Sequence, residues 1–183
     1  MKVLGISGSM RKDGNTAQIV RYILAKVQTA GIETEFVSLA DREIKPCTGC
    51  EKCKETKWCV IEGDDWSAVA EKMLEAEVVV LGSPTYYYDI NGQMKNLIDR
   101  TYSFYHDRKL AGRNAVAVTV CADRGCERSL ETIEGFLNTH QFSYLGHVCG
   151  KAYLPGEIMT DARAVRKSDE AARKIINLLQ PHD

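Results

Sequence analysis

The segment Val78-Val79-Val80-Leu81-Gly82 decides the fold class of this chain. A continuous run of β-branched and aliphatic residues is typical of a strand buried on both faces, as in parallel sheets covered by helices. Apolar residues at helical spacing flank the segment, from Trp66 to Leu74 before it and from Met94 to Tyr105 after it. The segment therefore predicts a helix–strand–helix unit of an α/β protein.

The same alternation extends outward over the whole chain. We predict strands at 3–6, 33–39, 78–81, 115–120 and 144–148, and helices at 19–27, 66–74, 94–105, 130–137 and 162–179. Five strands alternating with five helices predict a parallel, doubly wound sheet with helices on both faces. The 183 residues hold no internal repeat and no Ser/Pro-rich linker, which predicts a single domain over residues 1–183.

Charge and hydropathy exclude two classes of partner. The net charge is −1, whereas nucleic-acid-binding surfaces carry a basic excess, so no nucleic-acid partner is expected. The longest apolar run, 78–81, is far shorter than the ~18 residues of a membrane span, so no membrane partner is expected. The apolar N-terminus is short and is followed at once by Arg11-Lys12-Asp13, which indicates a first strand rather than a signal peptide and a cytoplasmic protein.

The first candidate loop runs from Ser7 to Thr16, at the carboxyl end of strand one, where doubly wound sheets bind ligands. It matches neither the dinucleotide fingerprint nor the P-loop, because the glycine spacing is wrong and Asn15 stands where a lysine should be. Hydroxyls, Arg11 and a helix N-terminus at Thr16 form a cradle for one terminal phosphate, such as that of FMN. The alternative is a solvated turn whose polar side chains only cap the helix.

The second candidate loop, Gly82 to Gly92, follows strand three and contains Tyr86-Tyr87-Tyr88. Three successive tyrosines cannot all face one core, and flat rings beside backbone N–H groups suit a planar heterocycle. A dimer contact is the alternative, because tyrosine is enriched at interfaces.

The third candidate loop, Cys121 to Cys126, follows strand four and is placed to close over the other edge of a ligand. Cys121 and Cys126 are candidates for a reactive pair, but the sequence favours buried structural thiols, which are commoner.

These loops carry a resemblance to a known family. The stretches Ser7-Gly8-Ser9-Met10-Arg11, Gly14-Asn15-Thr16, Ser83-Pro84-Thr85-Tyr86, 92–100 and Asp123-Arg124-Gly125 resemble the flavodoxin-like NAD(P)H-dependent FMN reductase superfamily. The resemblance implies a flavodoxin-like sheet of strand order 2-1-3-4-5. It also implies FMN at the strand ends, with its phosphate in the first loop and its isoalloxazine ring in the Ser-Pro-Thr-Tyr loop, and assembly into dimers or tetramers.

Fifteen residues are therefore expected to contact FMN. They are Ser7, Ser9, Met10, Arg11, Asn15, Thr16, Pro84, Thr85, Tyr86, Tyr87, Tyr88, Asn91, Ala122, Asp123 and Gly125. Because the cofactor performs the redox chemistry and the protein orients it, we expect no catalytic acid–base residue.

A cysteine-rich loop at 46–63 is inserted after strand two. Its spacing, Cys47-x2-Cys50-x2-Cys53-x5-Cys59, begins like a ferredoxin motif, and four thiolates are what a [4Fe–4S] cluster requires. Gly49 allows a tight turn between the first two of these cysteines. Structural zinc is one alternative, although zinc usually takes two separated cysteine pairs. Unligated thiols are the other, because oxygen destroys exposed clusters.

Within the superfamily, this cysteine spacing followed by Gly63-Asp64-Asp65 resembles the iron–sulfur flavoprotein branch. That resemblance implies a [4Fe–4S] cluster held by the four cysteines that exchanges electrons with FMN. Since the loop leaves strand two at the same sheet end as the flavin loops, the cluster is expected within reach of FMN in its own or a neighbouring subunit.

The sequence therefore predicts an FMN-dependent oxidoreductase that passes electrons between a [4Fe–4S] cluster and FMN. NAD(P)H is the candidate donor, and a redox protein or a small molecule is the acceptor. The alternative is a cluster-free NAD(P)H-dependent reductase of flavins, quinones, nitro or azo compounds. A third hypothesis, a zinc-stabilised binding module without flavin, is disfavoured because the residues of the flavin loops are intact.

Overall fold

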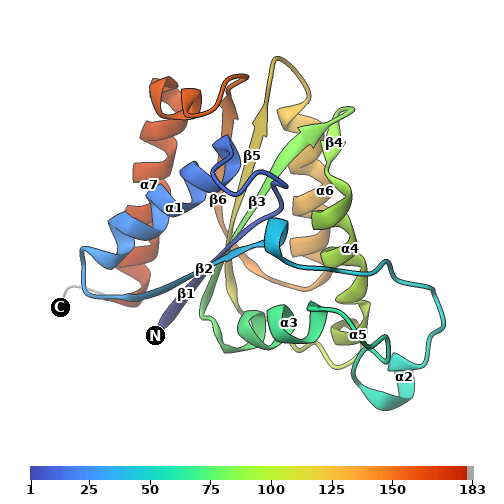
Figure 1. Ribbon diagram of the computed structural model, residues 1–183. Coiled ribbons are helices and arrows are strands. Elements are labelled where there is room, and N and C mark those ends of the chain that lie inside the picture. The colour runs from blue at the N-terminus through green and yellow to red at the C-terminus, as the bar shows by residue number, and fades with distance from the viewer. Residues whose placement is uncertain (181–183) are drawn as a thin grey trace.

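The computed structural model describes residues 1–180 and contains a parallel sheet of five long strands (Figure 1). These are β1 (Lys2–Ser7), β2 (Glu33–Ser38), β3 (Val78–Tyr86), β5 (Asn114–Cys121) and β6 (Ser143–Lys151). Their order is β2-β1-β3-β5-β6, which is the flavodoxin-like order 2-1-3-4-5 when only the long strands are counted. The predicted fold class is confirmed, while residues 181–183 of the predicted domain lie outside the described part.

Helices cover both faces of the sheet (Figure 1). One face packs against α1 (Asn15–Gln28) and α7 (Ala162–Leu179). The other packs against α3 (Trp66–Glu75), α4 (Gly92–Arg100), α5 (Tyr102–Tyr105) and α6 (Cys126–Thr139). Short helical turns complete the fold, namely η1 (Leu39–Asp41), α2 (Cys53–Thr56) and η2 (Glu157–Thr160). Within residues 1–180, no helix combines the length and apolar character that crossing a membrane requires.

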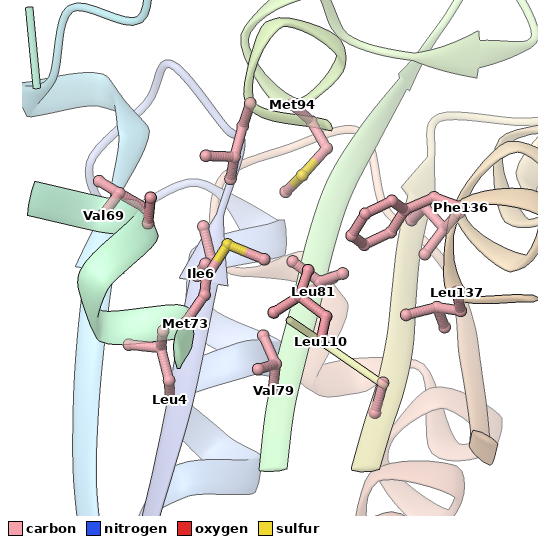
Figure 2. Close-up of a cluster of buried hydrophobic side chains, with 14 of the residues drawn as sticks. Leu4, Ile6, Val69, Met73, Val79, Leu81, Met94, Leu110, Phe136 and Leu137 are labelled. Atoms are coloured by element: carbon pink, nitrogen blue, oxygen red, sulfur yellow. The ribbon is translucent and has the colours of Figure 1, made fainter. Parts of the chain in front are cut away.

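The alternation of side chains along β3 explains its uninterrupted apolar run. Val79 and Leu81 point into the core beneath α3, α4 and α6, whereas Val78 and Val80 point into the core beneath α1 and α7. Figure 2 shows the first of these cores, in which Leu81 faces Met73, Met94 and Phe136. A central strand with helices on both sides has no polar face, so positions 78–81 are all apolar.

The structure extends β3 beyond the predicted end at Leu81. The strand continues to Tyr86 and turns back into β4 (Asp89–Ile90), with Thr85 opposite Ile90 and Tyr86 opposite Asp89. The stretch predicted as an open loop is therefore partly a β-hairpin. Its turn residues, Tyr87 and Tyr88, have φ of 50° and 66°. A turn of this kind usually takes Asn or Gly, so two tyrosines do not indicate it.

The helix predicted over 94–105 is divided at Thr101. Both the backbone N–H of Thr101 and its hydroxyl donate to the carbonyl of Ile98, at 3.0 Å and 2.6 Å. This three-residue spacing replaces the four-residue spacing of an α-helix, so the chain changes direction between α4 and α5.

Candidate functional site

The first loop folds around the hydroxyl of Ser9. Ser9 Oγ accepts a hydrogen bond from the N–H of Arg11 and donates one to the Arg11 carbonyl, both at 3.2 Å. The N–H of Gly14 then bonds to the same carbonyl at 2.9 Å. Helix α1 begins at the next residue, and no side chain caps its first turn. Its first N–H groups, which have no partner inside the helix, therefore face the loop and are available to an anion.

Gly14 is required by the close packing of this loop. A Cβ atom at this position would lie 2.6 Å from Ser9 Oγ and 3.0 Å from Arg11 Cβ. Gly14 is not among the fifteen residues expected to contact FMN; its φ of −66° suits any residue, and only the packing excludes a side chain. The loop thus forms a tight concave backbone of the kind that receives a phosphate.

The β3–β4 hairpin is held in place by α6 and by the loop before it. Ser129 Oγ donates to Thr85 Oγ1 at 2.9 Å, and Thr132 Oγ1 donates to Asp89 Oδ1 at 2.7 Å. Gly125, at φ 94°, lies so close to Tyr88 that a Cβ there would be 2.9 Å from the Tyr88 Cα. The hairpin is therefore a fixed wall at the carboxyl end of the sheet.

A hollow of about 240 Å³ lies between the first loop, the hairpin and the ends of β5 and β6. Eight of the predicted flavin-binding residues line it, namely Ser9, Arg11, Asn15, Thr16, Pro84, Thr85, Tyr86 and Ala122. Four lining residues were missed, namely Gly14, Val120, Ala152 and Tyr153. The position of Tyr153 just after the last strand was a usable signal, because all parallel strands end at the same edge.

Seven predicted residues do not line this hollow, and their contact with FMN stays a prediction. Two are buried and organise the loops: Ser7 Oγ accepts from the Ser9 N–H at 3.3 Å, and Asn91 Nδ2 donates to the Gly8 carbonyl at 2.5 Å. Gly125 is buried against the hairpin. The other four are exposed: Met10, Tyr87, Tyr88 and Asp123. Tyr87 is wholly exposed, at 101%, so its ring extends into solvent.

Asn15 lines the hollow and also fixes the segment after β6. Its Nδ2 donates to the Leu154 carbonyl at 2.9 Å, and its Oδ1 accepts from the Ile158 N–H at 3.3 Å. These bonds bring Tyr153 over the pocket from a position far along the chain. The first loop and the C-terminal part of the sheet are thus joined at the site.

The cysteine segment is closed at its base by backbone and carboxylate contacts. The N–H of Asp65 bonds to the Glu43 carbonyl at 2.8 Å, and the N–H of Glu43 bonds to Asp65 Oδ2 at the same distance. Asp64 Oδ2 accepts from the N–H of Lys45 at 2.9 Å. The chain therefore leaves and returns at nearly one point, with all four cysteines in between.

A buried arginine holds this segment to α4. The side chain of Arg100 is 0% exposed. Its Nε donates to Cys59 Sγ at 2.9 Å, and its other nitrogens donate to Asp64 Oδ2 and to two backbone carbonyls, those of Lys45 and Ile61. Burial alone would raise the pKa of Asp64, but the Arg100 hydrogen bond and two backbone N–H groups hold that pKa below its usual value. From the sequence, Arg100 is only the last residue of the family-like stretch 92–100, and no contact was expected of it.

An aromatic cluster fixes the end of the segment next to Cys59. The rings of Trp58, Trp66 and Phe104 lie within 5.4 Å of one another, and the Arg100 guanidinium lies 4.9 Å from the Trp66 ring. Burying such rings contributes a large apolar area, which explains why a polar segment packs firmly at this end.

The four sulfurs differ in exposure. Cys47 and Cys50 are exposed, whereas Cys53 and Cys59 are half-buried. The N–H of Lys52 lowers the pKa of Cys50, while burial and the neighbouring thiols raise the pKa of Cys53. Gly49, at φ 64°, makes the turn predicted for it. Within residues 1–180, no three His, Cys, Asp or Glu side chains converge on a single-ion site.

The cysteine segment leaves the sheet after β2, as predicted, and then runs along α4 away from the flavin hollow (Figure 1). Helix α4 begins beside the first loop, where Asn91 caps it, and ends at Arg100 beside Cys59. Figure 1 shows the segment running from η1 along α4 to α2 and α5. Nine residues at 1.5 Å rise separate the two ends by about 14 Å. The packing of Trp58 against Trp66 and Phe104 draws the segment there.

Comparison with known families agrees with this geometry. The model of the NADPH-dependent FMN reductase family matches residues 1–151. This range includes every strand of the sheet, the first loop and the β3–β4 hairpin. The chain belongs to the NADPH-dependent FMN reductase family. Membership makes it a flavin-dependent oxidoreductase, with FMN as the flavin that the family's description names, and the predicted resemblance is confirmed.

Two relatives in this family share nearly the full length of the chain. An iron–sulfur flavoprotein of Methanocaldococcus jannaschii is 40% identical over 174 residues, covering 93% of this chain and 89% of the relative. An iron–sulfur flavoprotein of Methanosarcina thermophila is 30% identical over 187 residues, covering 98% of this chain and 96% of the relative. Both names agree with the branch that the cysteine spacing resembles.

Among solved structures, RosB with a bound 8-demethyl-8-formylriboflavin-5′-phosphate intermediate shares the fold. Its TM-score is 0.76 at 17% identity, covering 100% of this chain and 82% of RosB. At that identity the likeness concerns the fold, which agrees with the family assignment.

Proposed function

We propose that this member of the FMN reductase family carries electrons between FMN and a [4Fe–4S] cluster held by Cys47, Cys50, Cys53 and Cys59. The observation that carries the proposal is the cysteine segment: four thiols on one loop, closed at its base and anchored by a buried arginine that reaches the last of them. Two relatives named iron–sulfur flavoproteins support it.

The residues at the strand ends fit FMN. The N–H groups of the first turn of α1 and the guanidinium of Arg11 would hold the phosphate, in a backbone cradle that a side chain at Gly14 would fill. Pro84, Thr85 and Tyr86 would lie against the isoalloxazine ring, because they form the rigid wall of the same hollow. The chain's own task is to bind and orient the ring and to exclude water from one of its sides.

The donor set of the cysteine segment fits a cluster better than it fits zinc. A single zinc ion needs four ligands converged at about 2.3 Å from one point. An iron–sulfur cluster accepts thiolates that stand further apart, one on each iron. The N–H of Arg100 beside Cys59 would favour the thiolate form of that ligand, and the exposed Cys47 and Cys50, on either side of the turn at Gly49, would complete the set.

When bound, FMN takes electrons in pairs and gives them singly while the cluster takes one at a time, so together they link a two-electron donor to a one-electron acceptor. We propose NAD(P)H as the donor and a redox protein or a small molecule as the acceptor. The helix-length separation between Arg100 and the flavin hollow supports assembly as a homodimer or homotetramer, in which the segment of one copy approaches the flavin of another. Seven free thiols support a cytoplasmic, reducing location.

A second function rests on a specific observation. Cys47 and Cys50 are exposed, and a cluster on an exposed loop is open to oxygen. A cluster-free NAD(P)H-dependent reductase of FMN, quinones or nitro compounds would use the same flavin hollow and leave the cysteine segment without iron.

Purification without oxygen, followed by assays of FMN, iron and acid-labile sulfide, tests the proposal. We expect FMN together with about four iron and four sulfide per chain. Cys53→Ser should lose the iron and keep the FMN, whereas the control Cys121→Ser, at the end of β5, should keep both. If the anaerobic protein holds FMN but no iron, the cluster is excluded and the cluster-free reductase is the remaining function. If Cys53→Ser retains iron, the assignment of Cys53 as a ligand is wrong.

A further inference from the structure

A second group of thiols lies outside both the flavin hollow and the cysteine segment. It consists of Cys121 at the end of β5, Cys126 at the start of α6 and Cys149 on β6. The proposed function assigns none of the three a role. Cys149 and Thr119 are directly paired across the sheet, so their side chains lie next to each other on the same face.

Two of these sulfurs meet around Thr119. The hydroxyl of Thr119 lies 3.4 Å from Cys149 Sγ, and Cys126 Sγ lies 3.5 Å from the Thr119 carbonyl oxygen. Cys126 Sγ also donates to the carbonyl of Gly150, the residue that follows Cys149, at 3.2 Å. The Cys126 and Cys149 thiols are therefore neighbours, although they are distant in sequence.

Only Cys149 can be reached from solvent. Cys126 is 3% exposed and Cys121 is 2% exposed. Cys149 is partly exposed and lines a hollow of about 320 Å³. The charged and titratable residues around this hollow come from three elements, namely Glu127, Glu131 and Glu134 of α6, His147 of β6, and Arg163 and Lys167 of α7.

The two thiols also differ in acidity. The neighbouring Cys126 thiol and then the Thr119 hydroxyl, 3.4 Å from Cys149 Sγ, lower the pKa of Cys149 to about 7, against the effect of its burial. The interaction with Cys149 and burial raise the pKa of Cys126. A thiol with a pKa near ambient pH is the most effective attacking group in disulfide exchange.

We propose that Cys149 and Cys126 form a dithiol that reacts with small-molecule disulfides, with Cys149 as the attacking thiol and Cys126 as the resolving thiol. The thiolate of Cys149 attacks one sulfur of the small disulfide, whose S–S bond breaks and releases one thiolate. The sulfur of Cys126 then attacks Cys149, its proton passes to a departing thiolate, and the second small thiol leaves. The protein pair is oxidised by two electrons, and the small disulfide is reduced to two thiols.

The position of Cys126 connects this reaction to the flavin hollow. Residues 122–125 immediately precede Cys126, and Gly125 packs against the hairpin at Tyr88. A disulfide at Cys126 would restrain the start of α6 and the loop beside it.

Trypsin separates the thiols, which makes the test direct. Cys121 falls in the peptide 114–124, Cys126 in 125–128 and Cys149 in 129–151. FMN-loaded protein, treated without oxygen with oxidised glutathione, should yield peptides 125–128 and 129–151 joined by a disulfide. In Cys126→Ser, glutathione should remain on Cys149. In Cys121→Ser, the joined peptides should form as in the wild type.

Three results would overturn the proposal. One is a Cys149 that stays unmodified while thiols of the cysteine segment react. Another is glutathione that persists on Cys149 in the wild type with no transfer to Cys126. The third is a disulfide that joins Cys121 to Cys126. The wild-type peptide map decides each of these outcomes without relying on the folding of any variant.

Discussion

Arg100 Nε donates a hydrogen bond to Cys59 Sγ over 2.9 Å, although the two residues are 41 positions apart in the chain. The same guanidinium bonds to Asp64 and to the carbonyls on both sides of the cysteine segment. A cationic N–H aimed at a sulfur stabilises negative charge there. The position of Cys59 and the electrostatics of its sulfur are thus set by the end of α4.

Replacing Arg100 with Lys should release the segment. Lysine keeps the charge but lacks the planar fork of five donors, so it cannot replace the bonds to Cys59, Lys45 and Ile61 together. Removing one charge of a buried pair costs about 3–5 kcal/mol, and because lysine keeps the charge we expect a loss below that range. Urea unfolding should show that loss, and iron assays should show poorer retention of the cluster. Arg128→Lys, an exposed position on α6 paired with Glu131, is the matched control and should change neither value.

Where iron is retained, the reduction potential of the Arg100→Lys protein should fall. The reduced cluster carries more negative charge, and an N–H donor near a ligand sulfur stabilises that state. A redox titration followed by absorption measures the potential. An unchanged or higher value would show that Arg100 acts on the position of the segment alone.

Asp64→Asn should destabilise the protein at neutral pH and much less in acid. Because the folded-state pKa of Asp64 lies below its unfolded value, its carboxylate contributes stability that is present above about pH 4 and lost as pH falls through the folded pKa. Urea unfolding at several pH values should show a wild-type advantage at pH 7 that closes below about pH 4. If the difference in unfolding free energy between the wild type and Asp64→Asn stayed constant over this pH range, the ion pair would be excluded as its source.

Gly14→Ala should weaken FMN binding by about tenfold or more, because each 1.4 kcal/mol lost is a factor of ten. The added Cβ would lie 2.6 Å from Ser9 Oγ and would displace the hydroxyl that shapes the first loop. Fluorescence titration of the apoprotein with FMN measures the affinity. The control is Gly135→Ala in α6, where an added Cβ meets nothing within 4 Å. Helix propensity predicts that this control keeps its affinity and gains about 0.5–1 kcal/mol of stability. Equal FMN affinities for the two variants would remove the first loop from the phosphate site.

Tyr86→Ala should weaken FMN binding more than Tyr87→Ala. Tyr86 lines the flavin hollow, whereas Tyr87 is wholly exposed at the tip of the hairpin. The φ of Tyr87 is positive, a conformation that costs energy for any residue except glycine. Tyr87→Gly should therefore gain about 1 kcal/mol of stability. Affinity titrations and urea unfolding check the two parts separately. The reverse order of affinities would place Tyr87 against the ring.

The sequence was sufficient for the sheet because the sheet depends on local patterns. The run from Val78 to Leu81 indicates a strand with two buried faces, and the helical stripes around it indicate the layers. The first loop was selected from residue types at the end of the first strand, and most of its predicted members line the hollow. Adjacent residues determine each of these features.

The features that the sequence did not reveal depend on contacts between distant residues. Arg100 meets Cys59 only because α4 and the cysteine segment run side by side. Tyr153 reaches the hollow because Asn15 bonds to the Leu154 carbonyl. The sequence pairs Cys126 with Cys121, its neighbour along the chain, and the sheet places Cys149 beside it as well.

The closed base of the cysteine segment makes this part of the molecule an excursion that starts and ends at one point of the fold. Glu43 and Asp65 already meet through two hydrogen bonds of 2.8 Å, so a short turn could join them without moving β2 or α3. The phosphate loop, the hairpin and α1 contribute nothing to that junction. The length of chain between Glu43 and Asp65 is therefore not set by the strand and helix on either side of it.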